Sequence, residues 1–388
     1  MKDNSSSTSS SDASTAAQPT LRSVLTIALV TLVSLVVLDV AVGFVTRMPR
    51  DPRERPNTLQ RYFDYGRSVE SKLRMRVGET IETSTPVIGA GWLESPVPVG
   101  QAKQPSAPGK VLLAVYGQSF THQAADLLVE TDPRFELRKL GGPAAPLAHS
   151  YTMYQQDRRE HDAQVAVIGI VAGTLPMLVT MTPMTVMFED PYPYTYPRYF
   201  LRDGKLESYQ PQLRSFAQLR AALDDPQQWQ RFETDLREHD LAYDDFVFEA
   251  DWLDYSTLGR AVRRGYAQKQ MRAAVARYVS PHGLRNQDGL VDTATALLLE
   301  FAKTARADGR LPYVLLFQDA GTGNSLAASL GPALEQNDIG YLSSFAFVPP
   351  SDSGNFLKDG HFRPGLMQRF VDAWHEDLLA RLAKAAPQ

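Results

Sequence analysis

The chain has 388 residues, of which 43% are hydrophobic and 22% are charged, and its formal net charge is −4. This composition is typical of a globular protein, and without a long basic stripe we expect no nucleic-acid partner. Cysteine is absent, which excludes disulfides, thiolate zinc sites and a cysteine nucleophile.

A polar tail comes first in the chain. Residues 1–20 are rich in Ser, Thr, Ala and Asp and cannot bury enough apolar surface to fold. We therefore expect a disordered tail over residues 1–22.

An apolar segment, residues 23–45, follows the tail. Its length matches the roughly twenty residues that a helix needs to cross a bilayer, and Asp39 is its one ionisable residue. A cleaved signal peptide is the alternative, because small residues stand at 41–43. The apolar run exceeds the usual signal core of about 7–15 residues, which favours an uncleaved anchor in the lipid bilayer.

The orientation of this anchor has two readings. Four arginines follow the segment, and counted literally the positive-inside rule places the large domain in the cytoplasm. A lone N-terminal anchor ahead of a large domain commonly exports that domain instead. We expect export, mainly because of the family resemblance described below.

Residues 46–109 are predicted to form a juxtamembrane linker and packing segment. Residues 46–60 contain several prolines and arginines, and residues 59–78 favour a short helix packed on the main domain. Residues 94–110 are rich in Pro, Gly and Ser and predict an exposed loop.

Residues 110–388 alternate between apolar strands and helical stretches, which predicts an α/β domain with a mainly parallel sheet. The expected strands are 111–116, 136–140, 163–172, 312–318 and 339–345. Long polar and apolar helical patterns over residues 212–279 interrupt this rhythm and predict a helical insertion.

Candidate catalytic residues stand where the strands of this sheet are expected to end. Ser119 follows the first strand in "YGQSF", and "DGHFRPG" near the C-terminus supplies Asp359 and His361. A serine nucleophile needs a base, an acid that orients the base, and oxyanion donors. The backbone N–H groups of Ser119 and of Gly142, in "GGPAAP", are the candidate donors.

These three stretches resemble the blocks of the SGNH (GDSL-like) hydrolase superfamily. The resemblance covers about residues 110–385 and implies a three-layer, flavodoxin-like sandwich with a Ser119–His361–Asp359 site. It also implies an ester hydrolase or O-acyltransferase, and the membrane-anchored form implies a bacterial inner-membrane protein with a periplasmic domain.

The chain departs from the superfamily pattern in two ways. The third block normally carries an Asn that donates to the oxyanion, whereas "GIVAGTLP" has none. Only Gly360 separates Asp359 from His361, a spacing that resembles the membrane-associated polysaccharide O-acetyltransferases of the alginate type. Asn324 and Asn355 are weak candidates for the missing amide.

Each candidate residue also has a simpler interpretation. Ser119 could cap the following helix, Asp359 could cap the last one, His361 could bind backbone, and Gly142 could belong to an ordinary turn. His149 and Ser150 are interpreted as capping and surface-packing residues. The loop 188–200 alternates Pro and Tyr, and Tyr192, Tyr194 and Tyr196 are candidates for a carbohydrate-binding rim.

The sequence therefore predicts an esterase or acyltransferase that acts on acyl esters of an envelope or extracellular polysaccharide. The expected partners are the bilayer, an acylated glycan and membrane proteins of polysaccharide biosynthesis. No cofactor and no metal are expected, because the histidines lack ligand spacing. The alternative is a degenerate SGNH-like scaffold or glycan-binding protein, since the third-block Asn is missing.

Overall fold

A computed structural model describes residues 20–49, 54–78, 89–94 and 106–385 of the chain. Most of the predicted tail and most of the loop 94–110 lie outside the described residues. The predicted apolar helix is confirmed: α1 (Leu21–Val45) is long and apolar enough to cross a membrane, with a mean hydropathy of 2.6. None of its residues is buried.

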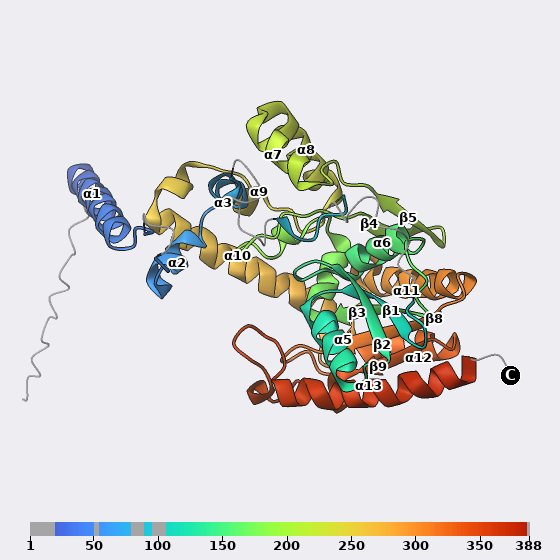
Figure 1. The fold of residues 1–388 in the computed structure, drawn as a ribbon. Helices are drawn as coiled ribbons and strands as arrows, with labels where there is room; N and C mark the ends of the chain where they lie inside the picture. Colours follow the sequence, from blue (N-terminus) through green and yellow to red (C-terminus); the bar gives the residue numbers. More distant parts are fainter. Residues whose placement is uncertain (1–19, 50–53, 79–88, 95–105, 386–388) are drawn as a thin grey trace, which may run out of the picture.

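A five-stranded sheet forms the centre of the main domain (Figure 1). Its strands lie in the order β2-β1-β3-β8-β9, and every neighbouring pair is parallel. The prediction of an α/β domain with a mainly parallel sheet is thus confirmed. The strands are β1 (Val111–Gly117), β2 (Phe135–Gly141), β3 (Val165–Val171), β8 (Leu311–Phe317) and β9 (Gly340–Ser343).

Helices cover both faces of this sheet. Leu113, Val115 and the other residues of that face pack against α5 (Ser119–Thr131) and α13 (Pro364–Ala385). Leu112, Ala114 and their neighbours pack against α6 (Leu147–Asp157), α11 (Leu290–Ala307) and α12 (Ser325–Gln336). Burial on both faces explains why the central strands are continuous apolar runs.

The connection from β3 to β8 holds the predicted helical stretch 212–279 and more. Its helices extend from the sheet in Figure 1. Before α11, which ends the connection, its elements are η2 (Ala172–Val179), η3 (Pro183–Thr185), β4 (Arg198–Arg202), β5 (Lys205–Tyr209), α7 (Phe216–Asp224), α8 (Pro226–His239), α9 (Asp245–Phe248), η4 (Trp252–Tyr255), α10 (Thr257–Tyr278), β6 (Val279–Ser280), β7 (Gly283–Leu284) and η5 (Gln287–Gly289).

Two short helices, rather than one, occupy the packing segment after the anchor. They are α2 (Thr58–Asp64), whose Asn57 forms a capping box with Gln60, and α3 (Val69–Arg76), which Ser68 caps. Val69 and Leu73 of α3 are fully buried in the core of the main domain. Two further single turns, η6 (Ser344–Ala346) and η7 (Ser353–Asn355), precede α13.

Candidate functional site

The C-terminal edge of the sheet carries the residues that the sequence indicated. The strand order reverses at β1, which has β2 on one side and β3 on the other. Ligands of open α/β sheets bind at such a switch point, outside the carboxyl ends of the strands. Ser119 follows β1 and Gly142 follows β2, and the last residues of the two strands, Gly117 and Gly141, pair in register.

Ser119 and His361 meet at this edge although 242 positions separate them in the sequence. The Ser119 Oγ lies 2.7 Å from the His361 Nε2. Ser119 is the first residue of α5, and Gln118 is the N-cap, so capping is not what the serine hydroxyl does. When the hydroxyl donates to Nε2, the ring proton lies on Nδ1. The pair has the geometry of a nucleophile beside a general base.

The imidazole of His361 is held from one side by an aromatic cluster. Its ring stacks on Phe120 with the centroids 4.8 Å apart and the planes 22° from parallel. Phe120 in turn meets Phe362 edge-on at 5.0 Å and packs against Phe317. Phe120 was not predicted as a site residue, although it directly follows Ser119 in the sequence.

Asp359 lies beside the other nitrogen of the imidazole. Its Oδ2 is 3.3 Å from the His361 Nδ1, an ion-pair distance, but the two groups are not aligned for a hydrogen bond. Its Oδ1 accepts the His361 backbone N–H at 3.2 Å, which lowers the pKa of the carboxyl below its usual value. Gly360 has a φ of +87°, the left-handed turn that the short spacing requires. The Asp359 side chain is 66% exposed.

The loop that contains Gly142 packs closely against the backbone at Gly91. A Cβ at residue 142 would lie 2.8 Å from the Cα of Gly91, so glycine is needed there. Tyr194 donates its hydroxyl to the Pro143 carbonyl at 2.8 Å, and the His149 Nε2 lies 2.7 Å from the Gly91 carbonyl. These contacts hold the loop beside the end of β1, and Gly142 remains the candidate second oxyanion donor.

The prediction of a carbohydrate-binding rim has to be corrected, because its tyrosines are buried. Tyr194 and Tyr196 are fully buried, and Tyr196 bonds the Thr180 hydroxyl at 2.6 Å. Tyr192 is partly buried against the same core. The rings of Tyr194 and Tyr196 therefore offer no open face to a sugar, and Tyr194 supports the Gly142 loop instead.

The interpretation of His149 and Ser150 as surface residues is also wrong, since both are fully buried in α6. Burial lowers the pKa of His149 to about 4, which keeps the ring neutral. Its centroid lies 4.8 Å from that of Tyr194. The two rings thus form one packed layer behind the Gly142 loop.

The stretch "GIVAGTLP", which runs from β3 into η2, contacts a carboxylate from another part of the sheet edge. The Gly173 N–H donates to Asp319, which follows β8, and burial raises the pKa of that carboxyl to about 6. The Asn355 amide donates to the Pro349 carbonyl at 3.0 Å, and the Asn324 Oδ1 is buried without a partner. Asp319 was not predicted, because no sequence signal separates it from its neighbours after β8.

Two further observations bound the site. Within the described ranges, no group of three His, Asp or Glu side chains is placed to hold a metal ion. A cavity of about 300 Å³ lies against α10 and is lined by Phe188, Tyr243 and Met271 among others. Neither Ser119 nor His361 lines this cavity. The candidate site is therefore identified by the contact between these two side chains and not by the cavity.

Comparisons of the chain with models of protein families, with curated proteins and with solved structures found no match.

Proposed function

We propose that the protein is a membrane-anchored serine esterase or O-acyltransferase of the SGNH-like type. The observation that carries the proposal is the 2.7 Å contact between the Ser119 Oγ and the His361 Nε2 at the switch point of the sheet. The strand order β2-β1-β3-β8-β9 is that of flavodoxin-like sheets, and it supports the proposed fold family.

The proposed reaction begins with attack of the Ser119 Oγ on an acyl carbonyl. His361 takes the hydroxyl proton on Nε2 and returns it to the leaving alcohol. The N–H of Ser119 lies in the first turn of α5, where N–H groups have no intrahelical acceptor, and with Gly142 it would bind the oxyanion. The acyl-enzyme then passes its acyl group to water or to a sugar hydroxyl that His361 deprotonates.

The proposed substrate is an acyl ester of a cell-envelope or extracellular polysaccharide. The motif resemblance and α1 support it, because an anchored enzyme works beside the envelope. The proposed location is a bacterial inner membrane with the main domain in the periplasm. A reporter fused after Gln388 that works only in the cytoplasm tests the orientation: its activity would overturn the export proposal.

A second candidate is a non-catalytic, glycan-binding scaffold. The observations that favour it are the missing third-block amide, the Asp319 carboxylate that takes the Gly173 N–H, and the unaligned Asp359. Loss of one oxyanion donor typically lowers kcat on the order of 100- to 1000-fold. A weak esterase and a scaffold therefore differ in whether Ser119 reacts at all.

The deciding experiment treats the full chain in detergent with a fluorophosphonate probe and an acetyl ester. We expect covalent labelling of the wild type, and none of Ser119→Ala or His361→Ala. Ser106→Ala is the matched control, because Ser106 is an exposed hydroxyl whose partner is the Lys110 carbonyl. Equal labelling of the wild type and Ser119→Ala would overturn the proposal, and no labelling of a folded wild type would favour the scaffold.

A further inference from the structure

Two exposed aromatic side chains stand together on η4, far from the candidate site in the sequence. Trp252 is 74% exposed and Tyr255 is 89% exposed. Residues three apart in a 3₁₀ helix lie above one another, so the two rings extend from the same side of η4. Large exposed aromatic residues in such a pair mark an interaction surface.

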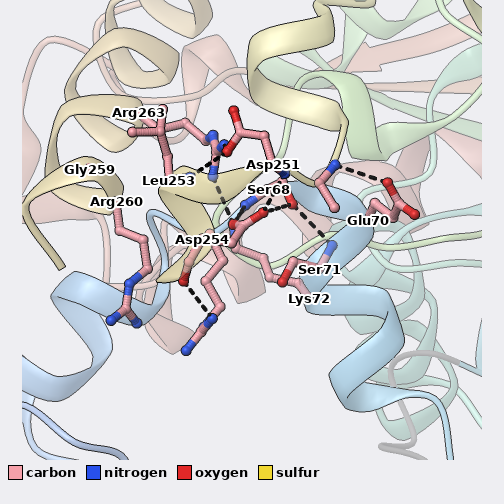
Figure 2. A network of polar contacts seen from close by, with 12 residues as sticks. Ser68, Glu70, Ser71, Lys72, Asp251, Leu253, Asp254, Gly259, Arg260 and Arg263 are labelled. Carbon is pink, nitrogen blue, oxygen red and sulfur yellow. Dashed lines mark hydrogen bonds and ion pairs between the residues drawn. The ribbon is translucent and has the colours of Figure 1, made fainter. Parts of the chain in front are cut away.

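The polar groups next to η4 form hydrogen bonds with one another in the interior of the protein, whereas the aromatic pair is exposed. Figure 2 shows residues of α3 and of the η4–α10 region converging on the buried Asp254. The Asp254 carboxylate accepts the backbone N–H and hydroxyl of Ser68 at 2.7 and 2.8 Å and the Arg263 guanidinium at 2.7 Å. Arg263 also pairs with Asp251. The network therefore fixes η4 in place.

The last turns of the apolar helix α1 contact the same region. The Asp39 Oδ1 accepts the Leu258 N–H at 2.7 Å and the Ser256 hydroxyl at 3.0 Å, at the N-terminus of α10. Gly43 lies against Thr257, because a Cβ at residue 43 would be 2.8 Å from the Thr257 Oγ1. In Figure 1, α1 projects from the body at this end of α10.

The length of α1 before Asp39 indicates how deep in a bilayer the contact between Asp39 and α10 would lie. Residues 21–38 have no buried member and precede Asp39. At 1.5 Å per residue they span roughly 27 Å, close to the hydrocarbon thickness of about 30 Å. When these residues cross a bilayer, Asp39 and the start of α10 lie at its boundary. The rings of Trp252 and Tyr255, which stand five and two residues before the first residue of α10, then lie at the same level.

We propose that η4 is a membrane-contact surface, with Trp252 and Tyr255 in the interfacial layer of the lipid bilayer and Asp39 fixing η4 at that level. This inference rests on the proposed membrane anchor and not on the proposed catalysis. Trp and Tyr are enriched at membrane interfaces, because their rings are apolar and their tips are polar. The two hydrogen bonds that Asp39 accepts satisfy a carboxylate that would otherwise be costly at the bilayer boundary.

The fluorescence of Trp252 tests the proposal directly. The other tryptophans, Trp92, Trp229 and Trp374, are at most 4% exposed, so the difference between wild type and Trp252→Phe isolates the emission of Trp252. The full chain is reconstituted into phosphatidylcholine–phosphatidylglycerol vesicles, with or without lipid brominated near the headgroup. We expect brominated lipid to quench most of the Trp252 emission and aqueous iodide to quench little of it.

Two substitutions and a control sharpen the test. Asp39→Leu removes the acceptor of the Leu258 N–H, and we expect a severalfold rise in iodide quenching of Trp252, whereas Asp39→Asn keeps an acceptor and stays near the wild type. Phe345→Asp, at a 40% exposed ring on η6, is expected to change neither measurement. Unchanged quenching in Asp39→Leu would overturn the role of Asp39.

Two other outcomes would overturn the surface itself. Free access of iodide to Trp252 without lipid quenching means that the rings lie in water. Protection from both quenchers means that another protein or another part of the chain covers them. Release of the wild type from vesicles by alkaline washing would overturn the anchor and the inference with it, while leaving the labelling of Ser119 unaffected.

Discussion

The cluster around Asp254 and the candidate site each combine a serine and an aspartate with a basic side chain, Arg263 in one and His361 in the other, and they differ in how fully they are hydrogen-bonded. The carboxylate of Asp254, which is 3% exposed, accepts hydrogen bonds on both oxygens from Ser68 and Arg263, and Arg263 is fully buried. At the candidate site, the His361 Nδ1 has no aligned partner and Asp359 is mostly exposed. A saturated buried cluster fixes structure, whereas an incomplete and accessible one keeps capacity for a substrate.

The two clusters share no residue, so substitutions can be made in each cluster separately. Substitutions around Asp254 should destabilise the fold, while substitutions at the candidate site should change activity in a protein that remains folded. The expected effects run from several kcal/mol of unfolding free energy to a modest change in rate.

The largest effect is expected for Arg263→Ala. The substitution leaves Asp254 with an uncompensated buried charge, which should lower the free energy of unfolding by about 3–5 kcal/mol. Denaturant titration of the purified chain measures this loss. The matched control is Arg237→Ala, because Arg237 also pairs with two carboxylates but is 46% exposed, and we expect at most about 1 kcal/mol there. Equal losses would contradict the assigned difference.

The layer behind the Gly142 loop should make stability depend on pH. His149 binds its proton near pH 4 in the folded protein and near 6.5 when unfolded, so the unfolded chain binds more protons between these values. Stability from this group is therefore complete above pH 6.5 and is lost as the pH falls toward 4, by about 3 kcal/mol in total.

Denaturant titrations at several pH values between 4 and 7 check this slope in the wild type and in His149→Gln. The glutamine amide can still donate to the Gly91 carbonyl but does not titrate. We expect a shallower slope in the variant. Parallel curves for the two proteins would show that His149 is not responsible.

Gly142→Ala should break the candidate site without breaking the sheet. The added Cβ would lie 2.8 Å from the Gly91 Cα, so the loop would have to shift from its present position. A displacement of about 1 Å can cost on the order of 100-fold in rate, and we expect that loss in kcat/KM for an acetyl ester. Gly265→Ala is the control, because a Cβ there meets nothing within 4 Å. An active Gly142→Ala variant would exclude the loop from the oxyanion site.

The smallest effect is expected for Asp359→Asn. Solvent screens an exposed and unaligned carboxylate, so we expect an activity loss of no more than about fivefold. A buried and aligned aspartate in a serine triad is worth about 10⁴-fold instead. A measured loss of that size would mean that Asp359 aligns with His361 when substrate binds. Asp352→Asn, at another exposed turn carboxylate, serves as the control.

Much of the fold was readable from the sequence because the strands of a doubly covered sheet are apolar throughout. All five strands lie within about three residues of their predicted bounds, and the helices α5, α6, α11 and α13 follow their patterns. The helix α12 was missed, since Gly331 and Pro332 weaken its signal. The hairpin β4–β5 was also missed, although Asp203 and Gly204 both take the positive φ of a tight hairpin turn.

Some features of the candidate site could likewise be predicted from the sequence, and others could not. Ser119, Asp359 and His361 could be predicted, because strand ends and a short motif mark them. The burial of Tyr194 and Tyr196 could not, since alternating Pro and Tyr look alike in a surface rim and in a core segment. The contact of Asp39 with α10 joins segments more than 200 positions apart and leaves no local pattern.

The long separation between Ser119 and His361 has a consequence for biosynthesis. Domains begin to fold while the chain is still being made, and β1 and α5 emerge well before the turn that carries His361. In the proposed mechanism, Ser119 therefore has no base until the segment with His361 and α13, which packs on α5, has followed. If the main domain is exported as proposed, a chain that is still passing through the translocation channel would be inactive, and activity would begin once passage is complete.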